Sequence, residues 1–188
     1  MTTPRFTAAL LAALALAASA GAPAANAEPR DGQHDFDFEI GKWSITLKKL
    51  VHPLRGSHEW LTATGTSVTR PVWGGKANLE EFEVDMPAPV GHIEGMTVRT
   101  YSTDSHQWSI YWANQKNGKI DSIPMTGEFD ASGHGLFYDQ EDFDGRAIYV
   151  RFEWSHPKPN AAHFEQSFST DGGKTWEVNW ITDQTRVE

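Results

Sequence analysis

The chain has 188 residues, of which 25 are acidic and 16 are Lys or Arg, so its formal net charge is −9. This acidic balance disfavours nucleic acid and anionic membrane surfaces as partners, because both bind basic surfaces. The sequence contains no cysteine, which excludes disulfides, thiol catalysis and cysteine-ligated metals, so we expect stability to come from packing.

The first 27 residues are typical of a secretory signal peptide. Arg5 precedes an apolar run at 8–18, and Ala25-Asn26-Ala27 has the small residues of a cleavage site. The apolar run is too short to span a bilayer and no cysteine follows it to carry a lipid, so we expect no membrane anchor. Cleavage near Ala27 predicts a periplasmic or secreted protein of about 160 residues, with a leader at 28–40 and one domain at 41–188.

Nearly the whole domain alternates apolar and polar residues with a period of two, between clusters of Gly, Pro, Asn and Asp. The expected strands cover 43–51, 58–69, 77–85, 92–103, 107–113, 120–129, 134–142, 146–155, 161–170 and 175–183. Their short connections predict an all-β fold, a single antiparallel up-and-down β-barrel of about ten strands, because closing the sheet removes exposed edges. A β-sandwich is the alternative. Only 35–40 suggests a helical turn.

Every second residue of a barrel strand points into the lumen, so the apolar set of each strand predicts its inner face. The predicted inward residues are Trp43, Ile45, Leu47, Trp60, Val68, Phe82, Val84, Met96, Val98, Trp108, Ile110, Trp112, Ile148, Val150, Phe152, Trp154, Phe164, Phe168, Trp176, Val178 and Trp180. Asn78, Glu80, Glu94 and Gln166 share these faces. A β-bulge would invert part of a strand.

The start of the first long strand, Gly41-Lys42-Trp43, resembles the Gly-x-Trp signature of lipocalins and other calycins. Arg186 near the end of the chain matches the arginine that stacks on that tryptophan in lipocalins. The resemblance implies a calycin barrel whose base these two residues close. A cation over an indole ring contributes about 0.5 to 2 kcal/mol.

A second resemblance covers most of the domain. It is carried by His34-Asp35-Phe36-Asp37-Phe38, Gly41-Lys42-Trp43, Gly74-Gly75, Gln107-Trp108-Ser109-Ile110, and Asp171-Gly172-Gly173-Lys174-Thr175-Trp176 followed by Asn179-Trp180. These segments are similar to the DUF1579-like family of uncharacterised bacterial exported proteins. The family implies a calycin-like fold and no particular chemistry.

The segment from Ser169 to Trp176 also matches the Asp-box pattern Ser-x-Asp-x-Gly-x-x-Trp of sialidase-like propellers, in which the Asp accepts backbone hydrogen bonds inside a hairpin turn. A propeller needs several blades of about 40 residues. With a single copy, we expect a turn that fixes the register of the last hairpin and no catalytic role for Asp171.

Polar residues among the predicted inward aromatic residues form the candidate site. Glu80 and Glu94 could act as acid and base if the lumen separates their pKa values. Apolar walls with a few placed polar groups are typical of small-molecule pockets. The candidate ligand-binding residues are Asn78, Arg99, Trp112, Tyr138, Trp154, Gln166 and Trp180. The competing interpretation pairs the carboxylates with Arg70, Arg99 or Arg151 in ion pairs without chemistry.

Other chemistries have little support in the sequence. His92-x-Glu94 and His163-x-Glu165 each offer two metal-ligand types, whereas a site needs three or four converging ligands, so we expect no metal and no cofactor. Eight histidines are present, and none singles itself out as a haem ligand. The sequence has no Gly-x-Ser-x-Gly elbow, phosphate loop or dinucleotide fingerprint.

Three functions remain open. The first is binding of a small, partly apolar or aromatic molecule inside the barrel. The second is a cofactor-free lyase, isomerase or hydrolase that uses lumen carboxylates as acid and base. The third is carbohydrate recognition by exposed tryptophans. A small molecule is the expected partner, and the sequence predicts no particular oligomeric state.

Overall fold

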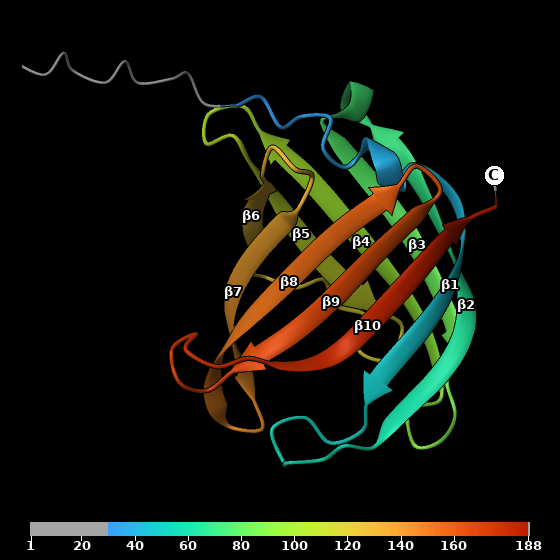
Figure 1. The fold of residues 1–188 in the computed structure, drawn as a ribbon, viewed down its shortest axis with the longest axis vertical. Coiled ribbons are helices and arrows are strands. Elements are labelled where there is room, and N and C mark those ends of the chain that lie inside the picture. The colour runs from blue at the N-terminus through green and yellow to red at the C-terminus, as the bar shows by residue number, and fades with distance from the viewer. Residues whose placement is uncertain (1–29, 188) are drawn as a thin grey trace, which may run out of the picture.

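The computed structural model describes residues 30–187, and the predicted signal peptide at 1–27 lies outside them. Ten antiparallel strands close into one barrel, in which each strand pairs with its neighbours in sequence and the last pairs with the first (Figure 1). The strands are β1 (Gly41–Leu50), β2 (Trp60–Val72), β3 (Ala77–Asp85), β4 (His92–Ser102), β5 (Gln107–Asn114), β6 (Met125–Phe129), β7 (Gly135–Phe143), β8 (Arg146–Lys158), β9 (Ala161–Ser169) and β10 (Glu177–Arg186). The up-and-down barrel is confirmed, and the sandwich alternative is wrong.

The main difference in strand bounds concerns β6, which begins at Met125 and not at 120. Pro124 precedes it and has no N–H to donate to a sheet ladder. The preceding segment contributes only a single bridge between Ala113 and Ile120. A long loop therefore connects β5 and β6 and runs back alongside the end of β5.

The seam between β1 and β10 is closed as the lipocalin resemblance implied. The Arg186 guanidinium lies 4.2 Å from the centre of the Trp43 ring. It also donates hydrogen bonds to the carbonyl oxygens of Phe38 and, at 2.6 Å, Ile40. Phe38 lies in the short 3-10 helix η1 (Asp37–Glu39) and Ile40 directly follows it, so one side chain fixes the entry of the chain into the barrel.

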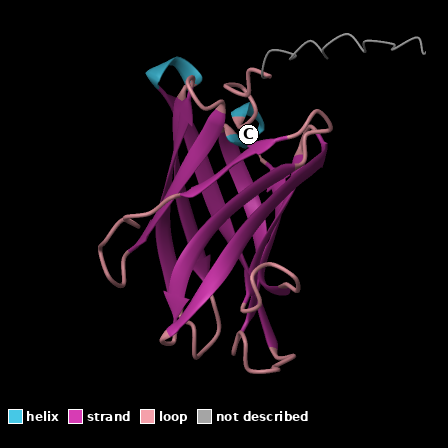
Figure 2. Cartoon of the chain, turned by 90° about the vertical axis from the view of Figure 1, so that its left-hand side faces the viewer, coloured by secondary structure: helices cyan, strands magenta, loops and turns pink. Residues whose placement is uncertain are grey.

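The segment before β1 closes one end of the lumen. Phe36 is fully buried, and its ring lies 4.9 to 5.4 Å from the rings of Trp108, Phe129 and Trp154, each in an edge-to-face arrangement. The second 3-10 helix, η2 (Trp73–Gly75), and the C-terminus lie at this same end, whereas the opposite end carries loops alone (Figure 2). The barrel therefore has a closed end and an end formed by hairpin loops.

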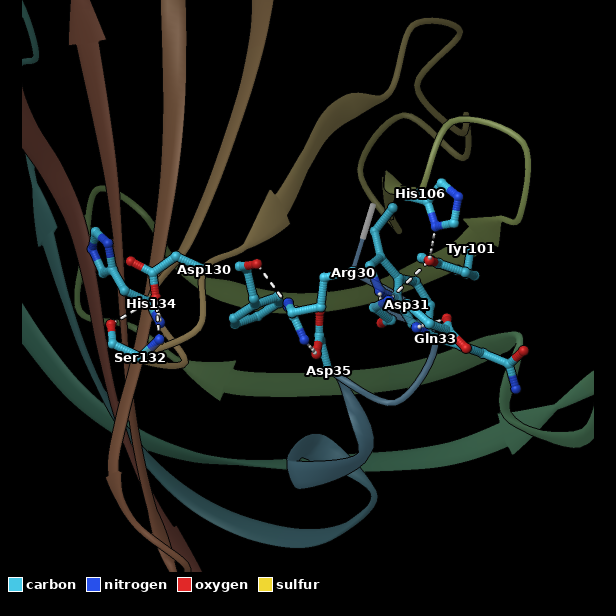
Figure 3. A network of polar contacts seen from close by, with 12 residues as sticks. Arg30, Asp31, Gln33, Asp35, Tyr101, His106, Asp130, Ser132 and His134 are labelled. Atoms are coloured by element: carbon cyan, nitrogen blue, oxygen red, sulfur yellow. Dashed lines mark hydrogen bonds and ion pairs between the residues drawn. The ribbon is translucent and has the colours of Figure 1, made fainter. Parts of the chain in front are cut away.

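Polar contacts hold this segment in place on the closed end (Figure 3). Arg30 pairs with Asp35 and donates to the carbonyl of Phe129 at 2.7 Å. Gly32 receives a hydrogen bond on its carbonyl from the Trp108 indole and donates its N–H to the Tyr101 hydroxyl, both at 2.9 Å. From Arg30 onward the leader is thus bound to β4, β5 and β6, and this part of it packs with the barrel.

The predicted inner faces are right for β1, β3, β5, β8 and β9 and wrong for β2 and β4. The predicted inward residues Trp60, Val68, Met96 and Val98 lie on the outer face. The true inner faces carry small or polar residues such as Ser67, Thr97 and Arg99, all buried. A Cβ on Gly95 would lie 2.1 Å from the Trp112 ring, so a large aromatic side chain of β5 occupies the space that β4 leaves.

The predicted inner face of β10 is wrong at its start, because a β-bulge lies between Val178 and Trp180. Before the bulge, Val178 pairs with Ser167 on the outer face, whereas Trp180 after it pairs with the inward Gln166. Trp176 and Val178 are therefore outward, and Trp180 is inward as predicted. The extra residue of the bulge shifts the alternation, so side chains before and after it that are an even number of residues apart point to opposite faces.

Candidate functional site

A cavity of about 260 Å³ lies in the lumen, between the closed end and the loops of the other end. Its walls carry two groups of aromatic side chains. In the first group the Phe82 ring contacts the rings of Trp112 and Trp180, and the second group consists of Phe152, Trp154, Phe164 and Phe168. The β5–β6 loop contributes Asp121 to the mouth of the cavity.

The floor of the cavity is a buried ion pair. Arg99 donates to Glu80 at 2.5 Å and to the side-chain oxygen of Asn78 at 3.1 Å. The second oxygen of Glu80 accepts from the Ser67 hydroxyl at 2.7 Å. The Arg99 guanidinium also lies 5.0 Å from the centre of the Phe36 ring, which links the floor to the closed end. Of the ion pairs in the competing interpretation, the one between Glu80 and Arg99 is present, and it adjoins a cavity.

Glu39 is a buried carboxyl group that the sequence analysis missed. It is fully buried behind the floor, and its Oε1 accepts from the Trp154 indole at 3.0 Å. Burial raises its pKa to about 7, with Arg99 opposing this shift and Glu80 adding to it. The sequence predicts only a helical turn at 35–40, and a glutamate in a short turn is usually exposed, so the sequence holds no signal for the burial of Glu39.

Carboxylates gather at the mouth of the cavity. Burial, together with repulsion from Asp139 and Asp121, raises the pKa of Glu141 to about 7. The pKa values of Asp121 and Asp139 are also raised, mainly by burial. Asp139 and Glu141 follow Phe137 on the same face of β7. The period-two alternation could therefore have predicted that both carboxylates lie on the inner face.

The structure brings most of the predicted site residues together. Glu80, Arg99, Trp112, Trp154, Gln166 and Trp180 all line the cavity. Asn78 is buried behind Arg99, which it binds. These placements show a shared location, and the role of each residue stays a prediction.

Two predicted site residues lie elsewhere. Glu94 is exposed on the outer face of β4, because Ile93 and Gly95 point inward. Tyr138 is 45% exposed, because its neighbours Phe137 and Asp139 occupy the inner face of β7. Neither side chain can touch a ligand in the lumen, so Glu80 and Glu94 do not form an acid and base pair.

The Asp-box segment forms the hairpin turn between β9 and β10. Asp171 accepts hydrogen bonds from the backbone of Lys174 and Thr175 and from the hydroxyls of Ser169 and Thr175, at 2.7 to 3.0 Å. Trp176 packs outside the barrel, with the Arg151 guanidinium 4.8 Å above its ring. The turn is confirmed, and it lies away from the residues that line the lumen cavity.

The two paired histidine motifs lie on the outer surface. His163 contacts Asp183 at 2.7 Å and Glu165 at 3.1 Å, and these carboxylates raise its pKa against the effect of burial. His92 contacts Asp85 at 2.7 Å. Among the side chains that the structure describes, which leave out those of 156–158, no three of His, Asp and Glu are arranged so that they could hold a metal ion. Within residues 30–187, no helix has the length and apolar character needed to cross a membrane.

Known proteins share the architecture of this chain. No protein-family model and no curated protein sequence matches it. Among solved structures, the S-type phycobiliprotein lyase CPES from Guillardia theta superposes with a TM-score of 0.54 and 12% identity, over 85% of this chain and 99% of that one. A redesigned β-barrel bound to DFHBI, mFAP0, gives a TM-score of 0.42 and 14% identity, over 79% and 99% of the two chains. At such identities, the likeness to the lyase shows a common barrel fold and nothing about chemistry.

Proposed function

We propose that this protein is an exported β-barrel that binds a small, partly aromatic molecule in its lumen. The observation that carries the proposal is the buried ion pair of Arg99 and Glu80 at the floor of an aromatic cavity. Apolar side chains of similar volume are often as stabilising as a buried ion pair, so packing alone does not account for these charges. Aromatic walls around a few placed polar groups suit recognition of a small molecule.

The cavity also indicates the kind of ligand. Its volume of about 260 Å³ is near the lower end of ligand pockets, which suits a compound of one or two rings. Gln184 lines the cavity, and its Oε1 has no hydrogen-bond partner among the described residues. A ligand hydroxyl or N–H group would satisfy this oxygen, because buried acceptors left unpaired are costly.

Export is part of the proposal. It is supported by Arg5, by the apolar run at 8–18 and by the small residues before Glu28, and by the similarity to the DUF1579-like exported proteins. Expression of the full chain in a Gram-negative host, followed by fractionation and intact mass, tests it. A periplasmic product that begins near Glu28 is expected, and an uncleaved cytoplasmic product would contradict export.

Binding is tested with 2-naphthol, a neutral two-ring compound with one hydroxyl. Trp112, Trp154 and Trp180 line the cavity, so their fluorescence should be quenched on titration. Thr97→Phe fills the lumen from the inner face of β4 and should abolish quenching, whereas Met96→Phe on the outer face should not. Circular dichroism verifies that both variants fold.

Native mass spectrometry of protein from the periplasm then searches for a co-purifying compound. Equal quenching in both variants, or none in the unaltered protein together with no bound compound, would refute the proposal.

Acid and base catalysis is a second candidate, favoured by Glu141, which lines the lumen cavity and whose pKa is raised to about 7. Glu80 is already held by Arg99 and Ser67, and Glu39 lies behind the floor and does not line the cavity. Glu141 is therefore the lining carboxyl group suited to donate a proton near neutral pH. Catalysis predicts that Glu141→Gln binds the co-purifying compound and no longer converts it. Unchanged conversion by this variant would exclude Glu141 as the acid.

A further inference from the structure

A second cavity, also of about 260 Å³, lies at the loop end of the barrel. Lys49 and Lys116 line it, together with Asn114 at the end of β5. Trp112, Gln166 and Trp180 line both this cavity and the lumen cavity. The two cavities therefore adjoin at three shared side chains.

Lys49 points into the barrel. It lies on β1 in the same alternation as the buried Ile45 and Leu47, and it pairs across the sheet with Trp180. Its ammonium lies 4.4 Å from the centre of the Trp180 ring. Burial, and then repulsion from Lys116, lower its pKa to about 8. No carboxylate of residues 30–187 forms an ion pair with it, so the aromatic ring is its favourable contact.

Lys116 reaches the same cavity from the β5–β6 loop. Its ammonium donates to the carbonyl of Val90, in the β3–β4 loop, at 2.8 Å. An ammonium has three donors, so this contact leaves two of them for another acceptor. Lys116 thus spans two loops and holds a positive charge at the mouth.

The two cavities differ in charge at the loop end of the barrel. Asp121 and Glu141 line the lumen cavity and not the lysine cavity. The lysine cavity has no Asp or Glu among its lining residues, and its polar amides can donate hydrogen bonds. An anionic group is therefore repelled from one cavity and attracted to the other.

We infer that the cavity between Lys49 and Lys116 binds the carboxylate of the same small molecule whose aromatic part occupies the lumen. The inference rests on the proposed function and narrows its ligand to an aromatic carboxylic acid. A carboxylate between the two ammonium groups relieves their mutual repulsion and supplies Lys49 with the anion that its surroundings lack. The shared Trp112 and Trp180 rings provide the surface along which the aromatic part enters.

The test compares 2-naphthoate with 2-naphthol at pH 7, by calorimetry and tryptophan fluorescence. These probes differ in the charged group and share the ring system. We expect 2-naphthoate to bind about tenfold more tightly, which is the order of one additional charge-assisted hydrogen bond. Lys49→Met keeps the length of the stem and should remove this preference, whereas Lys49→Arg should keep it. Lys48→Met, on the exposed face of the same strand, is the matched control and should change neither affinity.

The outcomes separate the two proposals. Binding of 2-naphthol without a preference for 2-naphthoate would overturn the carboxylate site and leave the lumen pocket standing. A preference that survives in Lys49→Met, or is lost equally in Lys48→Met, would also overturn it. If neither probe binds the unaltered protein, the proposed function fails together with this inference.

Discussion

Trp154 donates its indole N–H to Glu39 Oε1 across 3.0 Å and so ties the leader to the middle of β8. The other oxygen of Glu39 has no hydrogen-bond partner among the described residues, and neither has Gln184 Oε1. Gln184 is nevertheless one of the side chains that interact with the Glu39 carboxyl group, and this interaction, like the Trp154 hydrogen bond, favours the ionised form. Burial has the largest effect and favours the neutral form, so the pKa of Glu39 is raised to about 7.

Glu39→Gln should change the pH dependence of stability. The folded pKa of about 7 lies above the usual 4.5, so the folded state binds the proton more tightly. The unfolded chain loses its proton first as pH rises, and stability falls between pH 4.5 and 7, by on the order of 3 kcal/mol. Urea denaturation at pH 5 and pH 7.5 should show a smaller decrease in the Gln variant.

The matched control for this experiment is Glu94→Gln, on the exposed outer face of β4, which should keep the decrease of the unaltered protein. Glu141 also has a raised pKa and contributes a decrease of the same sign in all three proteins. The difference between the variants therefore isolates Glu39. Identical decreases in Glu39→Gln and Glu94→Gln would show that Glu39 is ionised in the folded protein.

Removing one partner of the buried ion pair should cost more than removing both. Arg99→Met leaves the Glu80 carboxylate buried without its cation, which typically costs about 3 to 5 kcal/mol. Adding Glu80→Leu removes the uncompensated charge and should restore part of this loss. Chemical denaturation of the single and double variants measures the coupling energy. Additive losses would mean that the two side chains do not interact in the folded state.

The residues that follow the simple rule of alternation were predictable from the sequence. On β1, β3 and β8 the large apolar residues do point inward, as with Trp43 and Phe82. The turn at Asp171 and the contact of Arg186 with Trp43 were predictable for another reason, because each depends on a short motif with a fixed local geometry.

The positions that could not be predicted depend on how side chains from different strands share the space in the lumen. The sequence of a single strand does not contain this information. Gly95 and Thr97 point inward because Trp112 of the next strand fills the space, and this places Met96 outside. Because the inner and outer faces of β4 are the reverse of those predicted, Glu94 points away from the cavity and Arg99 points into it. The inward position of Lys49 could have been predicted from its alternation with Leu47. A lysine near the end of a strand is, however, usually exposed to solvent.

Phe36→Ala should open the closed end of the barrel. The Phe36 ring packs edge-to-face on Trp108, Phe129 and Trp154, and deleting such a ring from a core typically costs about 3 to 5 kcal/mol. Hydrogen exchange should accelerate in the leader and at the η1 end of the adjoining strands. Trp73→Ala, at a side chain that is 72% exposed at the same end, is the control and should change stability little. A similar loss in both variants would contradict a specific closing role for Phe36.

Asp171→Asn should weaken the last hairpin and alter its response to acid. The hydroxyl and backbone N–H of Thr175, with the other hydrogen bonds of the turn, hold the pKa of Asp171 well below its usual 3.8. The unfolded chain takes up a proton first as pH falls, so this stabilisation is full above pH 3.8 and is lost as pH falls through the folded pKa. Thermal melting should therefore give the variant a lower Tm than the unaltered protein at pH 7 and a shallower decline of Tm below pH 3.8.

The control is Asp104→Asn, in the exposed β4–β5 turn, which matches the Asp-box pattern only loosely. This variant should leave both the Tm at pH 7 and the decline of Tm unchanged. A Tm at pH 7 equal in the two variants would mean that the Asp171 carboxylate does not stabilise the hairpin.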